Sequence, residues 1–214
     1  MKHITFYFDF ISPYAFLAFE QLPKALSGLS YQVTYKPVLF AGMLKHHGQL
    51  GPAEIAPKRI WTYRQVAWLA HENGIALQAP AAHPFNPLPL LRLALACGQE
   101  GACNRYVAET IFRHVWSSGK DAANEQRLAQ LSKLLAPAQD AHGTNVKAQL
   151  QANTHEALSS DAFGVPLLCV DGQQFWGFDA LPMLRQYLQG SPWFQQDSWR
   201  DAGQLPVGTS RVKL

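Results

Sequence analysis

The sequence predicts an α/β fold in which a small β-sheet is interrupted by a long helical segment. Strand patterns occur only near the start of the chain and again at residues 165–176, and helical periodicity dominates the residues between them. The 214 residues are 48% hydrophobic, 12% aromatic and only 15% charged. This composition is typical of a globular protein with a packed core rather than of a disordered chain.

The N-terminal segment predicts a strand, a helix and a second strand. Residues 3–10 are rich in aromatic and β-branched side chains, as strands are. Pro13 follows at a position that the first turn of a helix tolerates, and residues 14–26 carry apolar side chains at helical spacing. Residues 31–36 alternate in polarity and predict a second strand, which Pro37 ends.

The middle of the chain predicts only helices. Their apolar residues recur at helical spacing, and glycine or proline follows several of them. A proline-rich segment, residues 77–89, predicts an ordered loop between the first two of these helices. The predicted helices span residues 56–73, 87–99, 103–117, 122–136 and 145–159.

The C-terminal part predicts a hairpin, a helix and a tail. Residues 165–170 and 173–176 form the strands, and the Asp-Gly pair between them is a strong turn signal. A closing helix is expected over residues 179–188, with Asp179 as its N-cap. Prolines and glycines in the last 20 or so residues predict an extended tail.

The order β-α-β, helices, β-β-α is the thioredoxin topology interrupted after its second strand. The sequence thus predicts a thioredoxin-like fold with a large all-helical insertion. The expected thioredoxin-like domain is discontinuous, comprising residues 1–40 and 161–190. Residues 41–160 form the inserted helical domain, and residues 191–214 form the C-terminal tail.

Charge, hydropathy and cysteine content argue against several functional classes. A net charge of +3 without a run of Lys or Arg gives no support for nucleic-acid binding. No apolar run reaches the roughly 18 residues of a membrane span, and Asp9 interrupts what would be the apolar part of a signal peptide. We therefore expect a cytoplasmic protein. The three cysteines have no zinc-type spacing, so we expect reduced thiols and no metal.

Four segments, in order along the chain, resemble the 2-hydroxychromene-2-carboxylate isomerases. These segments are FDFISPYAFLA from residue 8, KPVLFAGMLK from residue 36, AFGVP from residue 162 and DGQQFWGFDALPML from residue 171. That family is grouped with the kappa-class glutathione transferases and DsbA-like proteins, and the similarity extends over all but the C-terminal tail. The resemblance implies glutathione as cofactor, a small-molecule substrate and a homodimer.

Ser12 is the candidate catalytic residue. In thioredoxin-like folds the loop after the first strand carries a redox Cys-x-x-Cys motif, but here the matching residues are Ser-Pro-Tyr-Ala. Dithiol exchange at this position is therefore excluded. The amino end of the helix still favours an anion, and the resemblance implies that Ser12 donates a hydrogen bond to the thiolate of bound glutathione. The alternative is that Ser12 is only a helix cap.

The resemblance also implies where glutathione binds. Val165 would pair through its backbone with the cysteinyl part, next to a cis-proline at Pro166, although Pro166 could be an ordinary strand-start proline. Asp179 would bind the γ-glutamyl ammonium, and the backbone of Ala180 would contribute beside it. Trp176 would form a wall of the site, unless it belongs to the core. Gln49 replaces an asparagine that is frequent in the family.

Lys36, Asn86 and Tyr14 are the expected substrate-binding residues. Lys36 stands at the end of the second strand, where its charge could meet a carboxylate or simply be solvated. Asn86 matches a family asparagine, although an Asx-turn role fits it equally well. Trp68 replaces a frequent arginine, which leaves the exact substrate open.

Together these features predict a glutathione-dependent isomerase of 2-hydroxychromene-2-carboxylate or a similar intermediate of aromatic catabolism. The expected chemistry is addition and elimination of the glutathione thiolate. Two alternatives remain: a kappa-class-like glutathione S-transferase, and a non-catalytic glutathione-binding protein of the thioredoxin fold.

Overall fold

A mixed four-stranded sheet lies at the centre of the molecule. It is seen in a computed structural model that describes residues 1–208. The strand order is β2-β1-β3-β4. β1 pairs in parallel with β2, and β3 is antiparallel to both β1 and β4. The strands are β1 (Lys2–Phe8), β2 (Tyr31–Pro37), β3 (Leu167–Val170) and β4 (Gln173–Trp176).

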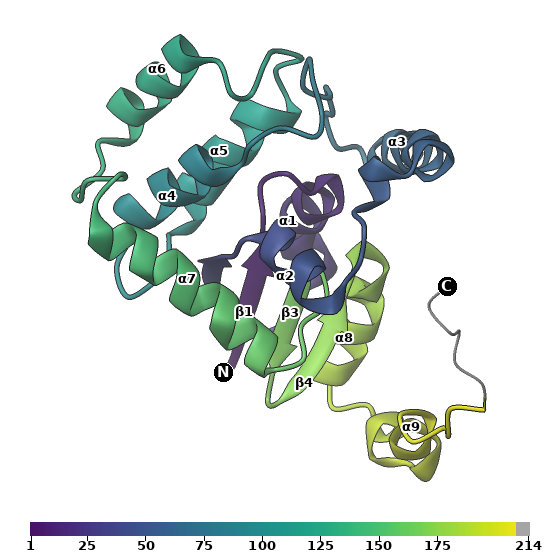
Figure 1. Ribbon diagram of the computed structural model, residues 1–214. Coiled ribbons are helices and arrows are strands. Elements are labelled where there is room, and N and C mark those ends of the chain that lie inside the picture. Colours follow the sequence, from purple (N-terminus) through teal and green to yellow (C-terminus); the bar gives the residue numbers. More distant parts are fainter. Residues whose placement is uncertain (209–214) are drawn as a thin grey trace.

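Helices cover the sheet, and the segment between β2 and β3 consists of helices joined by turns and loops, of which residues 73–87 form a long one (Figure 1). The predicted fold class, an α/β fold with a long helical segment after the second strand, is therefore confirmed. The α-helices are α1 (Pro13–Ala25), α2 (Phe40–His47), α3 (Ala56–Glu72), α4 (Leu88–Ala96), α5 (Arg105–Trp116), α6 (Glu125–Leu135), α7 (Thr144–Ser159), α8 (Leu181–Leu188) and α9 (Asp197–Ala202).

The hydrophobic core joins the sheet to the helices that follow β2. Phe8 and Phe10 at the end of β1 contact Phe112 of α5, with ring centroids 5.3 and 4.8 Å apart. Side chains of α1, α4 and α5 belong to this same buried cluster. A smaller cluster under α2 and α7 includes Tyr7 and Leu167. β1 is therefore covered on both faces, which explains why the successive side chains of Phe6, Tyr7 and Phe8 are all buried.

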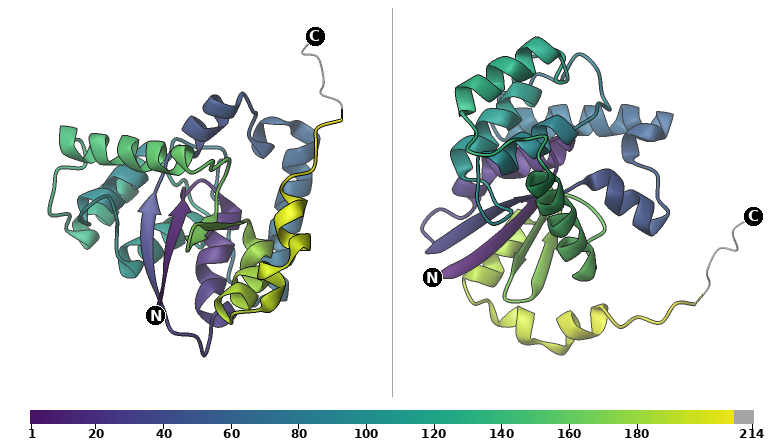
Figure 2. Two further views of the ribbon diagram at one scale, coloured as in Figure 1. Left: turned by 90° about the horizontal axis from the view of Figure 1, so that it is seen from below. Right: turned by 60° about the vertical axis from the view of Figure 1, so that its left-hand side comes forward.

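Three sequence predictions need correction. The helix α2 was not expected; it has no side-chain cap and ends at Gly48 in a left-handed conformation. Asp179 does not cap α8, because residues 178–180 form a 3₁₀ turn and Ala180 occupies the N-cap position. The C-terminal tail is not simply extended, since it contains a 3₁₀ turn (Pro192–Gln195) and α9, which stand out from the body (Figure 2).

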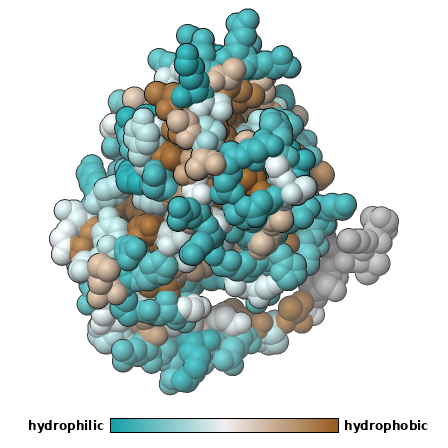
Figure 3. Space-filling view, turned by 90° about the vertical axis from the view of Figure 1, so that its left-hand side faces the viewer, coloured by the Kyte–Doolittle hydropathy of each residue, from teal (hydrophilic) through white to brown (hydrophobic). Residues whose placement is uncertain are grey.

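The surface of the face near α6 and α7 is mainly hydrophilic, with small separate groups of hydrophobic residues (Figure 3). Within residues 1–208, no helix is both long enough and apolar enough to cross a membrane. The division into a discontinuous thioredoxin-like domain and an inserted domain stays a prediction. The last part of the predicted tail, residues 209–214, lies outside the described residues.

Candidate functional site

Ser12 occupies the junction between β1 and α1 and is 7% exposed. It is the N-cap of α1: its Oγ accepts a hydrogen bond from the Ala15 N–H (3.2 Å), and its carbonyl accepts one from the Phe16 N–H (3.2 Å). Pro13 stands in the first turn, as the sequence predicts, and has no N–H to satisfy. The capping role is thus real, and it leaves the hydroxyl proton free to donate elsewhere.

The hydroxyl of Ser12 donates to the Val165 carbonyl oxygen at 3.4 Å. The Val165–Pro166 peptide bond is cis, as expected. Both residues precede β3, so the Val165 N–H has no ladder partner, and it makes no other hydrogen bond within the described residues. A short backbone segment with unused hydrogen-bonding capacity therefore lies directly beside the Ser12 hydroxyl.

The amino end of α1 adds another free donor. Because the Ala15 and Phe16 amides bond Ser12, the Tyr14 N–H is the first-turn amide left without an acceptor among the residues that the structure describes. Free amides at a helix amino end favour an anion. Ser12 and Tyr14 thus offer an O–H and an N–H at the positive end of one helix.

Asp179 lies near this helix end. Burial raises the pKa of the Tyr14 hydroxyl, and the nearby Asp179 carboxylate raises it further. Asp179 is itself exposed, whereas Ala180 is buried. The turn before them needs a glycine, because Gly177 has φ +97° and a side chain there would meet the Asp179 carboxylate. The turn of residues 178–180 packs against α1, which places Asp179 near Tyr14.

Trp176 covers the segment that leads to the cis-proline. Its ring lies 4.8 Å from the Phe163 ring, and a β-carbon on Gly164 would be only 2.8 Å from its Nε1. Trp176 is 51% exposed, so it does not belong to the core. Its position beside Gly164 agrees with a role as a wall of the site.

Gln49 is more remote from Ser12. Its backbone N–H caps the end of α2 by bonding the Leu44 carbonyl at 2.9 Å, and its side chain is exposed. His47 connects this helix end to the cis-proline segment, because its Nε2 lies 3.0 Å from the Ala162 carbonyl oxygen. Gln49 lies only two positions after His47, which contacts that segment. Among the described residues no hydrogen bond joins Gln49 to Ser12, and its role stays a prediction.

Lys36 and Asn86 already have partners within the protein. The Lys36 ammonium lies 2.6 Å from a carboxylate oxygen of Glu156, which also accepts from the Tyr7 hydroxyl at 2.6 Å. Asn86 accepts from the Leu88 N–H at 3.1 Å, which is the Asx-turn role left open above. A substrate contact by either residue stays a prediction, and one by Lys36 would compete with Glu156.

Two polar residues beside Ser12 were not among the predicted site residues. Asp9 is fully buried, and its carboxylate accepts from the Ile11 N–H (3.1 Å) and the Phe40 N–H (2.9 Å). His83 lies with Nε2 2.7 Å from the Ile11 carbonyl oxygen. The signal for Asp9 was present, since an aspartate inside an apolar strand sequence needs buried partners. No local pattern indicates that His83 reaches Ile11.

The three cysteines are free thiols, and Cys103 is buried. Burial raises the pKa of all three, to about 11 for Cys169. Within residues 1–208, no group of three or more His, Cys, Asp or Glu side chains could hold a metal ion.

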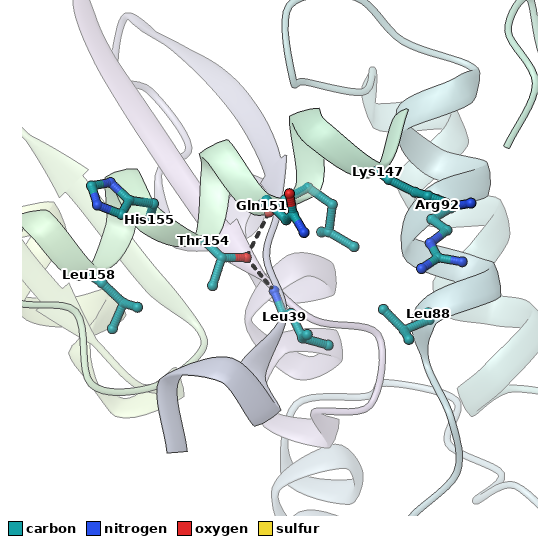
Figure 4. A pocket seen from close by; sticks show the side chains of 9 residues that line it. Leu39, Leu88, Arg92, Lys147, Gln151, Thr154, His155 and Leu158 are labelled. Atoms are coloured by element: carbon teal, nitrogen blue, oxygen red, sulfur yellow. Dashed lines mark hydrogen bonds between the residues drawn. The ribbon is translucent and has the colours of Figure 1, made fainter. Parts of the chain in front are cut away.

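A hollow of about 420 Å³ lies between α4 and α7, beside the start of α2 (Figure 4). Leu39 and Leu88 contribute apolar surface, while Arg92 and Lys147 contribute positive charge at one end. None of the predicted site residues lines this hollow. The candidate site at Ser12 is therefore a surface formed by a helix end, a cis-proline segment and a tryptophan rather than this cavity.

Comparison with known proteins shows what the whole chain is similar to. The chain is 27% identical over 194 residues to a 2-hydroxychromene-2-carboxylate isomerase of Sphingobium xenophagum, covering 87% of this chain and 98% of the relative. It is 25% identical to glutathione S-transferase kappa 2 of Caenorhabditis elegans, covering 87% and 92%. A solved 2-hydroxychromene-2-carboxylate isomerase superposes with a TM-score of 0.76 at 23% identity, covering 95% and 100%. Residues 3–189 match the DSBA-like thioredoxin domain, and the chain belongs to that family.

Proposed function

We propose that this protein is a glutathione-dependent isomerase that acts on 2-hydroxychromene-2-carboxylate or a similar intermediate of aromatic catabolism. The observation that carries the proposal is the place of Ser12. Its hydroxyl stands at the amino end of α1, 3.4 Å from the carbonyl oxygen that precedes the cis-proline, and no cysteine accompanies it. Relatives in the isomerase and kappa transferase groups support the reaction class.

The residues around Ser12 fit glutathione, which is a short peptide with a thiol. The unpaired N–H of Val165 can bond an extended peptide as another strand would. Asp179 supplies a carboxylate for an ammonium group, and the Ala180 backbone lies beside it. Trp176, exposed next to Gly164, can cover the ligand. Gln49 completes the proposed set from the end of α2.

Bound glutathione would supply the sulfur nucleophile, whose addition and elimination accounts for isomerisation without consuming the cofactor. The chain's own part is to favour the ionised sulfur. The Ser12 O–H can donate to it in place of the long bond to Val165, and the free Tyr14 N–H adds a second donor. The helix dipole stabilises negative charge at the same point. Each unit by which these groups lower the thiol pKa corresponds to about 1.4 kcal/mol.

The substrate would lie against Tyr14, Asn86 and Lys36. Lys36 could meet the substrate carboxylate because an ammonium has three N–H donors and is not saturated by Glu156. We further propose that the protein is a cytoplasmic homodimer, which sedimentation of the purified chain and its location in cell fractions would test.

A second candidate is a transferase of the kappa type, and the similarity to the kappa 2 transferase favours it. The two reactions differ in the fate of glutathione. An isomerase leaves its concentration unchanged, whereas a transferase converts it stoichiometrically into an adduct. Measuring free thiol and chromene isomerisation in the same reaction distinguishes them, and the absence of both would leave a glutathione-binding protein without catalysis.

The deciding experiment is Ser12→Ala, with Asn104→Ala as its matched control. Asn104 caps α5 as Ser12 caps α1, by accepting from the Val107 N–H at 2.9 Å, so each change should lower the free energy of unfolding by about 1 kcal/mol. We expect Ser12→Ala to lower glutathione-dependent kcat on the order of 100-fold and Asn104→Ala to leave it unchanged. If Ser12→Ala and Asn104→Ala had the same glutathione-dependent kcat, the proposed role of Ser12 would be refuted.

A further inference from the structure

The peptide group between Ile11 and Ser12 is held at both of its polar atoms. The Ser12 N–H donates to the Asp9 carbonyl at 3.0 Å, within the turn that links β1 to α1. The Ile11 carbonyl oxygen lies 2.7 Å from Nε2 of His83, a residue 72 positions later in the chain. Because this peptide plane fixes the positions of the Ser12 N and Cα atoms, its two anchors restrict where the side chain that carries the hydroxyl can lie.

The partners of His83 define which ring nitrogen carries the proton. A carbonyl oxygen only accepts, so Nε2 must carry a hydrogen to bond the Ile11 oxygen. Nδ1 lies 2.6 Å from the Tyr63 hydroxyl on α3. In the neutral ring Nδ1 is therefore the acceptor, and the Tyr63 O–H donates to it. Burial lowers the pKa of His83, which agrees with a neutral ring.

Aromatic contacts hold the imidazole in place. Its ring centroid lies 5.4 Å from that of Trp116 on α5 and 5.9 Å from that of Phe85. Trp116 itself donates from Nε1 to the Phe10 carbonyl at 2.9 Å. Two successive carbonyls before Ser12 thus accept from rings that belong to the helical segment of the chain rather than to the sheet.

We propose that His83, oriented by Tyr63, is a positioning residue for Ser12. It does not need to touch a ligand: it holds the Ile11 carbonyl, and through that peptide it directs the Ser12 hydroxyl toward the sulfur that Ser12 is proposed to bind. The inference deepens the proposed function and rests on it for the catalytic readout. The geometry of the hydrogen bonds can be tested without glutathione.

The test uses three variants. His83→Phe keeps a ring of similar shape between Trp116 and Phe85 but removes the donor to Ile11. His83→Gln restores an N–H donor and an acceptor. His114→Phe is the matched control, because Nε2 of His114 bonds the Ala122 carbonyl at 3.1 Å in the same manner and burial lowers its pKa likewise.

Two measurements on the ligand-free protein test the geometry. Nitrogen-15 NMR should find the wild-type His83 ring neutral with the proton on Nε2, and a proton on Nδ1 would overturn the inference. Amide hydrogen exchange at Ser12 should accelerate at least several-fold in His83→Phe and not in His114→Phe. Unchanged exchange would also overturn it.

Two measurements with glutathione test the consequence. The pKa of the bound thiol, followed by the ultraviolet absorbance of the thiolate, should rise by about one unit in His83→Phe. kcat should fall about tenfold with little change in KM, and His83→Gln should recover most of both losses. Losses of the same size in His114→Phe would show a merely structural effect and overturn the proposal.

The two proposals fail in distinguishable ways. If the wild type neither binds glutathione nor turns over any substrate, the proposed function fails, while NMR and exchange still decide whether His83 positions Ser12. If His83→Phe does not fold, Tyr63→Phe replaces it. That change removes the donor to Nδ1, and we expect a mixture of the two neutral ring forms and an intermediate rise in the thiol pKa.

Discussion

Asp9 shows how one residue beside the site can make the whole fold depend on pH. Its side chain is fully buried, and burial raises the pKa of the carboxyl to about 7, although hydrogen bonds from Phe40 and Ile11 oppose the shift. An unfolded aspartate ionises near pH 4. Between these values the folded protein binds more protons than the unfolded chain, so the free energy of unfolding falls as the pH rises from about 4 to 7.

We therefore expect urea unfolding of the wild type to give a midpoint that falls across this pH window, by an amount worth on the order of a few kcal/mol. Asp9→Asn should abolish most of that slope, because an amide does not titrate. Asp140→Asn is the matched control, since Asp140 accepts from the His142 N–H at 2.8 Å in a similar local bond but is exposed. A slope that survives in Asp9→Asn would contradict the assignment.

Among single residues, the sequence predicted those that a local motif identifies. Ser12 is the N-cap of α1 and Pro166 follows a cis peptide bond, as the Ser-Pro pair and the resemblance predict. His83 could not be found in this way, because its partner Ile11 is 72 residues away and a histidine in a proline-rich loop has many possible partners. Lys36 carries the right charge, but sequence alone does not reveal that Glu156 faces it.

At the scale of elements, the C-terminal arm formed by residues 192–202 contacts the rest of the protein through aromatic rings. The Phe194 ring lies 5.2 Å from the rings of Tyr187, Trp193 and Trp199, and 6.4 Å from that of Phe175 in β4. Phe194 thus connects the arm to α8 and to the edge of the sheet. These contacts explain why a segment rich in proline and glycine is not simply extended.

We expect Phe194→Ala to lower the free energy of unfolding by about 1–2 kcal/mol, less than for a fully buried phenylalanine. It should also make the peptide bonds of residues 196–208 more sensitive to limited proteolysis, which mass spectrometry of the fragments would measure. Trp193→Ala is the control, because Trp193 is 43% exposed and should matter less. Equal proteolysis of Phe194→Ala and the wild type would contradict this role.

The elements that sequence patterns missed are the short ones. α2 has eight residues, no capping side chain and buries only Met43, so its periodicity is too brief to distinguish from a loop. The longer helices were predicted with ends that differ by a few residues, as expected where termini depend on tertiary contacts. Asp179 was misplaced for the same reason, since a 3₁₀ turn inserted before α8 moved the helix start beyond it.

For the molecule as a whole, Asn153 of α7 joins parts that the sequence assigned to different domains. It is 4% exposed and donates to the Pro37 carbonyl (2.9 Å) at the end of β2 and to the Gly101 carbonyl (2.6 Å) in a turn between α4 and α5. The main hydrophobic cluster also includes residues of β1, α4 and α5. The predicted insertion therefore shares a core with the sheet.

We expect one cooperative unfolding transition in calorimetry, with no separate melting of residues 41–160. Asn153→Leu should lower the free energy of unfolding by about 2–4 kcal/mol, because two buried carbonyls lose their donor. Gln151→Leu on the same helix is a suitable control, since Gln151 lines the hollow beside α4. Two resolved transitions in the wild type would show instead that the predicted domains unfold independently.

The order of the strands and of the longer helices was predictable because each of these has a local signature, and the thioredoxin-like arrangement followed from that order. How the helical segment joins the sheet was not predictable, since Phe112 and Asn153 look like ordinary helix residues in the sequence. Their importance comes from contacts with Phe10 and Pro37, more than 100 positions away. Such long-range pairs carry no local pattern.

The state of the cysteines has a consequence for a protein proposed to work with a borrowed thiol. Only the ionised form of a thiol attacks a disulfide at an appreciable rate. Burial keeps Cys97, Cys103 and Cys169 protonated near neutral pH. Oxidised glutathione would therefore meet these thiols in their unreactive, protonated form, and we expect little mixed-disulfide formation on this chain.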